Sequence, residues 1–226
     1  MLQKSLHAKP PSIYTMTLCA LFTALITVGA FVQIQFPVVP ITLQTLFVIL
    51  CALLLGARRS AVSVGLYLFL GLSGLPVFTK GGGPGYVLQP TFGYLLGFLV
   101  AAVAVGFLSR KVDPADGATR ITVDLLSRRA DPLSRRAGLL FPRSRTGVFL
   151  CYWGIGLLGI LIIYLIGMVY MYFLMNYYMQ TPVGFLGFFT VNLLMTFAGD
   201  VFKCFVAAWL TVRLLPILRR STRWSE

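Results

Sequence analysis

The hydrophobic residues of this chain gather into six long stretches, separated by polar or Gly/Pro-rich segments. An α-helix needs about 20 predominantly apolar residues to cross the hydrocarbon core of a bilayer. The pattern therefore predicts six membrane spans, at residues 13–36, 41–57, 61–75, 91–108, 147–175 and 183–214. We expect the second and third spans to be short and the sixth to be interrupted at Thr196–Asp200. The chain is thus predicted to be an all-α integral membrane protein with a single membrane domain.

Two connecting segments stand out by their composition. Residues 74–85 combine glycine and proline at a density that breaks helices, yet they remain fairly apolar. Irregular backbone at membrane depth has to cover protein or line a cavity, so we expect this segment to act as a lid. Residues 109–146 hold nine of the 19 basic residues and four of the six acidic ones. We expect them to form a basic cytoplasmic loop, whose contacts with lipid or a partner are left open.

Composition and charge support the membrane class. Hydrophobic residues make up 58% of the chain and charged residues only 11%, whereas soluble domains carry about 25% charged residues. The formal net charge of +13 would suggest a nucleic-acid partner in a soluble protein. Here, however, every basic residue except Lys80 and Lys203 falls in the N-terminal tail, after the second or fourth span, or at the C-terminus. By the positive-inside rule, both termini are predicted to be cytoplasmic, and no nucleic-acid partner is expected.

Asp200 and Lys203 are the acid and the base that fall in the interior of predicted spans, away from the span ends. A charge near the bilayer centre costs at least about 2.5–3.5 kcal/mol, so it is rarely kept without a partner or a polar cavity. Their i, i+3 spacing places both on one helix face. Three interpretations stay open at this point: a structural ion pair, a proton relay, and a ligand site that offers an acceptor beside a donor. The last would suit a urea-like or amide-like ligand.

Catalytic and metal chemistry lack the residues that they need. The single histidine, His7, lies in the N-terminal tail, and the four cysteines lie in apolar stretches without metal-ligand spacing. With one acid inside the membrane, neither a nucleophilic nor a metal-assisted site can be assembled. The sequence therefore argues against an enzyme, and against a metal or another cofactor.

Further polar residues flank the outer ends of the predicted spans. They are Gln33, Gln35, Thr42, Gln44, Gln89, Thr91, Asn192 and Thr196. A mostly apolar pocket with a few convergent polar groups is the usual form of a small-molecule site. We therefore expect a cavity that opens to the outside beneath the lid.

Four sequence stretches together resemble the BioY family, the biotin-specific S components of energy-coupling factor (ECF) transporters. The stretches are Val39–Leu46 (VPITLQTL), Gly71–Phe78 (GLSGLPVF), Gln89–Phe98 (QPTFGYLLGF) and Gly199–Lys203 (GDVFK). They occur in order and at suitable spacing, and the resemblance covers residues 14–110 and 150–215. It implies an S-component fold of six helices in the bacterial cytoplasmic membrane and high-affinity uptake of biotin, which is the transported substrate and not a cofactor.

The resemblance also implies roles for individual residues. Asp200 and Lys203 would hold the polar ureido end of biotin, and Tyr94 and Tyr164 would enclose its ring and chain. The wall residues expected beside them are Gln44, Gln89 and Asn192.

Partners follow from the same resemblance. They would be a transmembrane T component and two cytoplasmic ATPases, because the chain has no nucleotide-binding loop of its own. Ala20 and Ala24 match the small-residue motif with which the family docks the T component. Two alternatives are kept: a stand-alone carrier for biotin or a related metabolite, and a membrane interaction protein whose Asp–Lys pair is structural.

Overall fold

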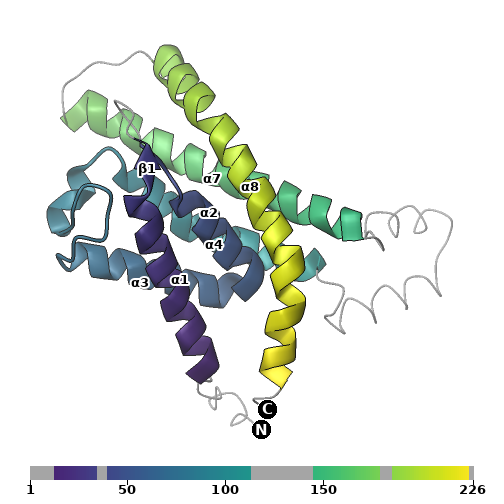
Figure 1. The fold of residues 1–226 in the computed structure, drawn as a ribbon. Helices are drawn as coiled ribbons and strands as arrows, with labels where there is room; N and C mark the ends of the chain where they lie inside the picture. The colour runs from purple at the N-terminus through teal and green to yellow at the C-terminus, as the bar shows by residue number, and fades with distance from the viewer. Residues whose placement is uncertain (1–12, 35–39, 113–144, 179–184, 224–226) are drawn as a thin grey trace, which may run out of the picture.

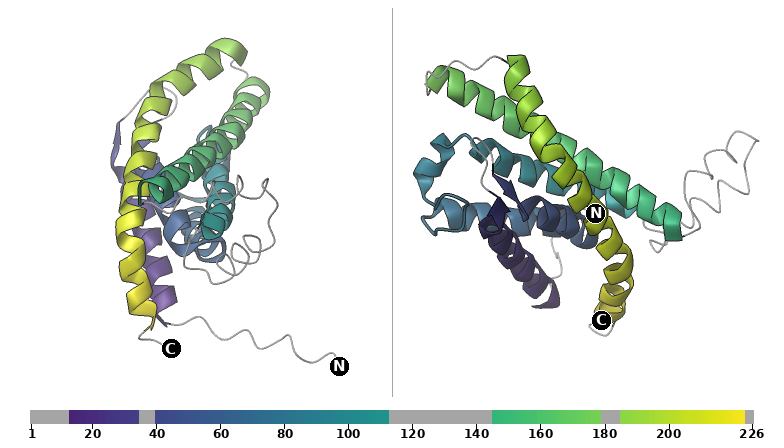
Figure 2. Two further views of the ribbon diagram at one scale, coloured as in Figure 1. Left: turned by 90° about the vertical axis from the view of Figure 1, so that its right-hand side faces the viewer. Right: turned by 45° about the horizontal axis from the view of Figure 1, so that its top comes forward.

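The computed structural model describes residues 13–34, 40–112, 145–178 and 185–223, apart from the side chains of residues 145, 185–195 and 219–223. Most of the predicted basic loop, residues 113–144, lies outside this description. The helices are α1 (Ile13–Phe31), α2 (Gln44–Leu55), α3 (Ala57–Leu72), α4 (Phe92–Val112), α7 (Arg145–Phe173) and α8 (Phe185–Arg223). They pack into one bundle, in which α8 crosses α7 and runs down toward the end where α1 begins (Figures 1 and 2).

The central helix of the bundle is α2. It contacts α1, α3, α4, α7 and α8, and nine of its 12 residues are buried. A helix that is hydrophobic on all sides is expected to be buried on all sides. At 1.5 Å per residue it is about 18 Å long, well short of a hydrocarbon core of about 30 Å. This helix therefore forms the middle of the core.

The turn between α2 and α3 consists of a single residue, Gly56. Its φ angle is 76°, a conformation that L side chains rarely adopt. A Cβ atom added there would also collide with the guanidinium group of Arg110, which comes from the end of α4. The glycine therefore permits both the sharp reversal of the chain and the close approach of α4.

Four of the described helical segments are long and apolar enough to cross a membrane. They are Ile13–Phe31, Phe92–Val112, Thr146–Tyr178 and Thr196–Leu218. Large apolar side chains such as Leu161, Leu165 and Phe202 are exposed on the outside of the bundle, where lipid tails would cover them. That all six predicted stretches span the membrane stays a prediction, because α2 and α3 are shorter than the other helices.

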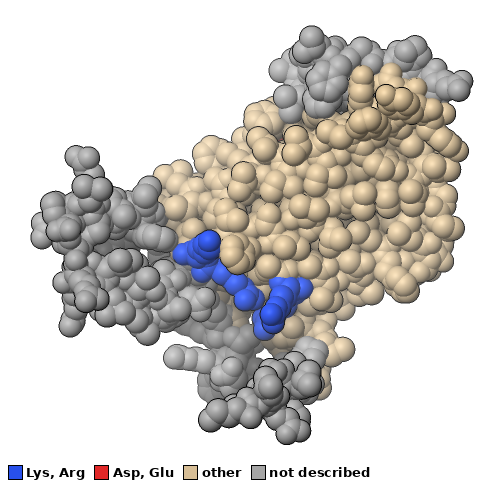
Figure 3. Space-filling model, turned by 180° about the vertical axis from the view of Figure 1, so that it is seen from behind, with Lys and Arg blue, Asp and Glu red and all other residues tan. Residues whose placement is uncertain are grey.

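Basic side chains mark one end of the described bundle. Arg58 and Arg59 lie exposed at the start of α3, and Arg110 and Lys111 lie exposed at the end of α4. Figure 3 shows Lys and Arg gathered near one edge of the described surface, with no acidic side chain among them. The first turn of α1 and the last turns of α8 lie at the same end of the molecule (Figure 1). This arrangement is the one expected if both termini are cytoplasmic, which stays a prediction.

The predicted interruption of the last span is wrong. The helix α8 runs without a break from Phe185 to Arg223, through Thr196–Asp200 and through Pro216. Aspartate weakens helices mainly when its side chain competes for backbone groups. Here the Asp200 carboxylate is engaged by other side chains, so the backbone keeps its own hydrogen bonds. The helix also continues nine residues past the predicted end at Leu214.

Irregular segments cover the opposite end of the bundle. A two-residue antiparallel pair joins β1 (Gln33–Ile34) to β2 (Ile41–Thr42), with Gln33 opposite Thr42. Between α3 and α4 the chain forms a tight turn at Phe78–Gly81 and then a short 3₁₀ helix, η1 (Pro84–Leu88). A π-helical turn, η2 (Leu174–Tyr178), extends α7 at its far end.

Phe78 anchors the segment between α3 and α4 to the bundle. Its side chain is 1% exposed and packs against the rings of Tyr67 and Tyr86, with ring centroids 5.3 and 4.5 Å away. The ring lies directly over Gly71, where an added Cβ would overlap it. The Gly/Pro-rich stretch is thus held against protein, as irregular backbone at membrane depth requires.

Candidate ligand-binding site

A cavity lies beneath these irregular segments, between β2, α2, α4, α7 and α8. Its volume is about 60 Å³, several times the roughly 10–15 Å³ that one buried water needs on the same measure. Leu95, Phe98 and Ile163 supply apolar wall. Polar side chains from β2, α2, α4, α7, α8 and the segment between α3 and α4 also line it. A largely apolar wall with a few convergent polar groups is the form that small-molecule sites take.

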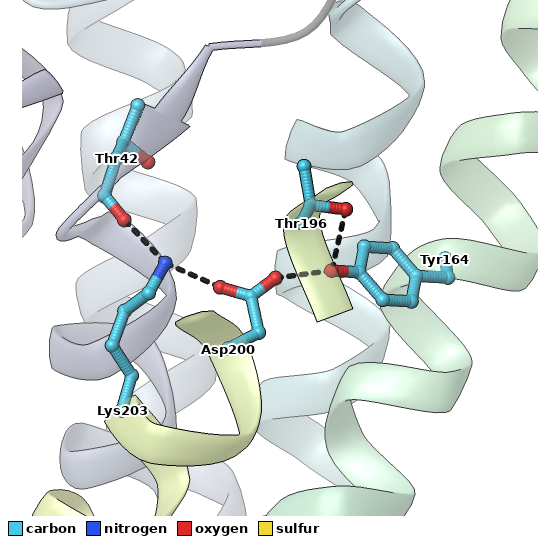
Figure 4. Close-up of polar contacts among 5 residues, drawn as sticks. All are labelled: Thr42, Tyr164, Thr196, Asp200 and Lys203. Atoms are coloured by element: carbon cyan, nitrogen blue, oxygen red, sulfur yellow. Dashed lines mark hydrogen bonds and ion pairs between the residues drawn. The ribbon is translucent and has the colours of Figure 1, made fainter. Parts of the chain in front are cut away.

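The charged end of the cavity is built on α8. Asp200 and Lys203 form an ion pair on successive turns of the helix, and each residue is more than nine-tenths buried. The Lys203 ammonium also donates to the backbone carbonyl of Thr42 in β2, at 2.8 Å (Figure 4). Lys203 therefore connects the last helix to the β1–β2 pair, which is about 160 residues away in the sequence.

The second carboxylate oxygen of Asp200 is held from α7. The Tyr164 hydroxyl donates to it, and the same hydroxyl lies 2.9 Å from the Thr196 hydroxyl (Figure 4). The ring of Tyr94, from α4, stands edge-on to Tyr164 with centroids 6.4 Å apart. Side chains of α7 and α8 thus hold the carboxylate, and Tyr94 of α4 packs against one of them.

The ion pair retains hydrogen-bonding capacity. An ammonium has three donors, and Lys203 uses two of them within the protein. A carboxylate accepts at about four lone-pair sites, and the contacts of Asp200 among the described residues use two. One cationic donor and further anionic acceptors therefore remain side by side. That set matches a ligand group with a carbonyl next to N–H donors.

A second polar group on the cavity wall consists of neutral hydroxyls. The Tyr86 hydroxyl, from η1, lies 2.9 Å from the Thr79 hydroxyl and 3.3 Å from that of Thr91. All three residues line the cavity. On the α2 side, the Gln44 amide donates to the Tyr67 hydroxyl at 2.6 Å, which in turn donates to the Val77 carbonyl at 3.3 Å. These bonds link the cavity wall to the segment between α3 and α4.

Five of the seven predicted ligand contacts line the cavity. They are Gln44, Tyr94, Tyr164, Asp200 and Lys203. Gln89 does not line it: it ends η1, where its backbone bridges to Tyr86 and Phe92. The side chain of Asn192 lies outside the described residues. That any of these residues binds a ligand stays a prediction.

Sequence reasoning missed part of the polar lining. Thr79 and Tyr86 lie in the irregular segment, where no helical periodicity indicates which side chains point inward. The one sequence signal was that Thr79 falls in, and Tyr86 directly follows, the Gly/Pro-rich stretch 74–85 that was expected to act as a lid. Tyr164 was expected to enclose a ligand with its ring, but its hydroxyl also contacts Asp200. Among the described residues, no group of three His, Cys, Asp or Glu side chains could hold a metal ion.

Comparison with known proteins places the chain in a family. The model of the BioY family matches residues 3–220. The chain is 33% identical over 213 residues to a probable biotin transporter BioY of Lysinibacillus sphaericus, covering 94% of this chain and 92% of that one. The chain belongs to the BioY family. A biotin transporter BioY of Thermotoga maritima is 46% identical over 92 residues, which is 40% of this chain and 54% of that protein.

A solved structure has the same fold. The S component for biotin from an ECF-type ABC transporter superposes with a TM-score of 0.62 and 24% identity, covering 89% of this chain and 90% of that one. The chain therefore has the S-component fold predicted from its sequence. It is a multi-pass protein of the bacterial cytoplasmic membrane and a transport component, not an enzyme.

Proposed function

We propose that this protein is the biotin-binding S component of an ECF transporter, which captures biotin outside the cell and delivers it to the cytoplasm. The observation that carries the proposal is the buried Asp200–Lys203 pair at one end of a cavity. Its unused donor and acceptors complement the carbonyl and N–H groups of a ureido ring. The relatives named as biotin transporters and the S-component fold support the same ligand.

Equilibrium binding to the purified chain is the direct test. We expect one-to-one, high-affinity binding of biotin in detergent, measured by calorimetry in the absence of other subunits. The cavity is formed by this chain alone, so capture should not require partners. A folded, monodisperse preparation that binds no biotin would contradict the assignment of biotin as the ligand.

Replacing Asp200 by Asn tests the charged end of the cavity. The substitution keeps the shape of the side chain but leaves Lys203 as an unpaired buried cation. Losing one partner of a buried, hydrogen-bonded charge pair typically costs about 2–5 kcal/mol of binding free energy. We therefore expect biotin affinity to fall at least about 30-fold, with the folded state checked by size-exclusion chromatography and thermal unfolding.

The same substitution distinguishes the structural alternative. Both charged groups already have protein partners, which is the observation that favours a purely structural pair. In that case, a membrane interaction protein with a structural pair would bind no biotin at all. Asp200→Asn would then lower the melting temperature without changing biotin transport.

Energy coupling would come from partners. A transmembrane T component and two cytoplasmic ATPases would drive release, and Ala20 and Ala24 of α1 would form the docking surface. Both alanines are exposed, next to exposed Leu21 and Val28 on the same helix. Small residues on a lipid-facing helix allow close helix–helix approach. Uptake by the chain alone, in cells that lack the partner subunits, would instead support a stand-alone carrier.

A further inference from the structure

We propose that Lys80 receives the anionic end of the ligand at the lid side of the cavity, and so sets the orientation in which biotin enters. The inference rests on the proposed function, since biotin carries an ionised carboxylate at neutral pH. Lys80 is the one basic residue in the loops that the charge pattern assigns to the outside. The positive-inside rule therefore gives no account of it.

The position of Lys80 is fixed by a tight turn. The Phe78 N–H donates to the Gly81 carbonyl at 2.9 Å, and the Gly81 N–H donates back to the Phe78 carbonyl at 3.2 Å. Thr79 and Lys80 form the tip between them. Thr79 lines the cavity and bonds to Tyr86, whereas Lys80 is exposed. The ammonium is thus attached one residue away from the cavity wall.

The turn is anchored on both sides. Phe78 is buried over Gly71 between two aromatic rings, and the Thr79 hydroxyl lies 2.9 Å from that of Tyr86. These contacts hold the backbone of the turn in one place beside the cavity. The charge of Lys80 therefore stays close to the lid end while its flexible side chain can follow a ligand.

No acid offsets this charge in the described part of the chain. Asp200 is the one acidic residue described, and it is paired with Lys203 inside the cavity. The exposed basic residues Arg58, Arg59, Arg110 and Lys111 lie at the ends of α2–α3 and α4 away from the turn. Lys80 is consequently an isolated cation at the lid, free of an ion-pair partner among the described residues.

The two polar groups on the cavity wall differ in how they receive an anion. A carboxylate placed at the charged end would lie beside Asp200 and be repelled by it. Near Thr79, Tyr86 and Thr91 it would meet neutral hydroxyls that line the cavity. Lys80, which is exposed, follows Thr79 directly in the chain. The anionic end of the ligand is therefore favoured at the lid, and the uncharged ureido end at Asp200.

The test varies the charge of the residue and the charge of the ligand together. The full chain is placed in phosphatidylcholine nanodiscs, so that the lipid adds no net charge. Biotin and its neutral carboxamide are then titrated into the wild type, Lys80→Gln and Lys80→Glu. Lys111→Gln is the matched control, because Lys111 is exposed at the opposite end of α4.

We expect Lys80→Gln to weaken biotin binding about two- to five-fold at low salt, the range of exposed charge pairs. Lys80→Glu should weaken it further, and about 0.5 M salt should remove most of the difference. Binding of the carboxamide should be the same in all three proteins, and Lys111→Gln should bind both ligands as the wild type does.

The outcomes separate this inference from the proposed function. A wild type that binds neither ligand would overturn the proposed function itself. A wild type that binds biotin, with Lys80→Gln weakening biotin and carboxamide equally, would show that Lys80 supports the turn and not the charge. Unchanged biotin affinity in Lys80→Glu at low salt would also overturn the assignment of Lys80.

Discussion

Asp200 is a buried carboxylate that its own helix and two other elements hold in place. Lys203 on its own helix, Tyr164 on α7 and, through Lys203, the Thr42 carbonyl of β2 form one connected network. A buried charge is tolerated when its lone pairs are satisfied in this way. The same network orients the carboxylate toward the cavity, so its structural and its proposed binding roles depend on the same atoms.

Removing the Tyr164 hydroxyl should weaken biotin binding without abolishing it. Tyr164→Phe keeps the ring that faces Tyr94 but frees one carboxylate oxygen of Asp200. A hydrogen bond to a charged group contributes about 1.5–3 kcal/mol, so we expect a loss of biotin affinity of roughly ten-fold or more by calorimetry. Tyr152→Phe, also on α7 but away from the cavity, is the control. Equal effects of the two variants would contradict a positioning role for Tyr164.

Among the elements, the segment between α3 and α4 depends most on a single contact. The ring of Phe78 occupies the space over Gly71 and positions both Thr79 and Tyr86 at the cavity. Gly/Pro-rich composition explains why this segment is not helical, but its fixed position comes from the buried aromatic ring. The segment therefore forms part of the cavity wall. Its backbone is hydrogen-bonded between Phe78 and Gly81.

A methyl group at position 71 should displace this segment. Gly71→Ala would force the Phe78 ring to move, and overpacking of this kind costs about 1–3 kcal/mol. We expect a lower melting temperature in detergent together with weaker biotin binding. Gly65→Ala on the same helix has open space at its Cβ position, and a helical Gly-to-Ala change there should stabilise by about 0.5–1 kcal/mol. A Gly71→Ala protein as stable as Gly65→Ala would refute the anchoring role of Phe78.

For the whole molecule, the proposed docking face on α1 lies apart from the cavity. Ala20 and Ala24 are exposed on the outside of the bundle, and the cavity is built without α1 side chains. A partner that packs closely on this face could tilt the bundle without contacting the ligand. The structure thus allows binding and energy coupling to be disrupted independently.

Enlarging the α1 face should block uptake but not binding. We expect Ala24→Trp to abolish biotin uptake in cells that supply the T component and ATPases, because the bulky ring prevents close helix approach. Biotin affinity of the purified variant should be unchanged. Val103→Trp, at an exposed position on α4, should leave both properties intact. Loss of binding in Ala24→Trp, or normal uptake, would argue against docking through α1.

Hydropathy and charge predicted much of this architecture because both can be assigned to each segment from its own residues. Apolar stretches of sufficient length predicted the helices, and their ends agree with the structure to within a few residues for α4. Asp200 and Lys203 could be identified because a charge in an apolar stretch is costly wherever the helix packs. The continuity of α8 could not be predicted, since it depends on the partners that keep the Asp200 side chain from the backbone.

The sequence by itself determined the membrane class, the number of apolar stretches and the pair of charged residues most suited to a ligand. Only the tertiary structure decided that α2 is the buried centre, that Tyr164 and Thr42 complete the charged end, and that Gln89 lies off the cavity. The physical reason is that hydropathy and charge cost act locally on each segment. Which side chains meet is set by the rotation and close packing of helices that are distant in the sequence.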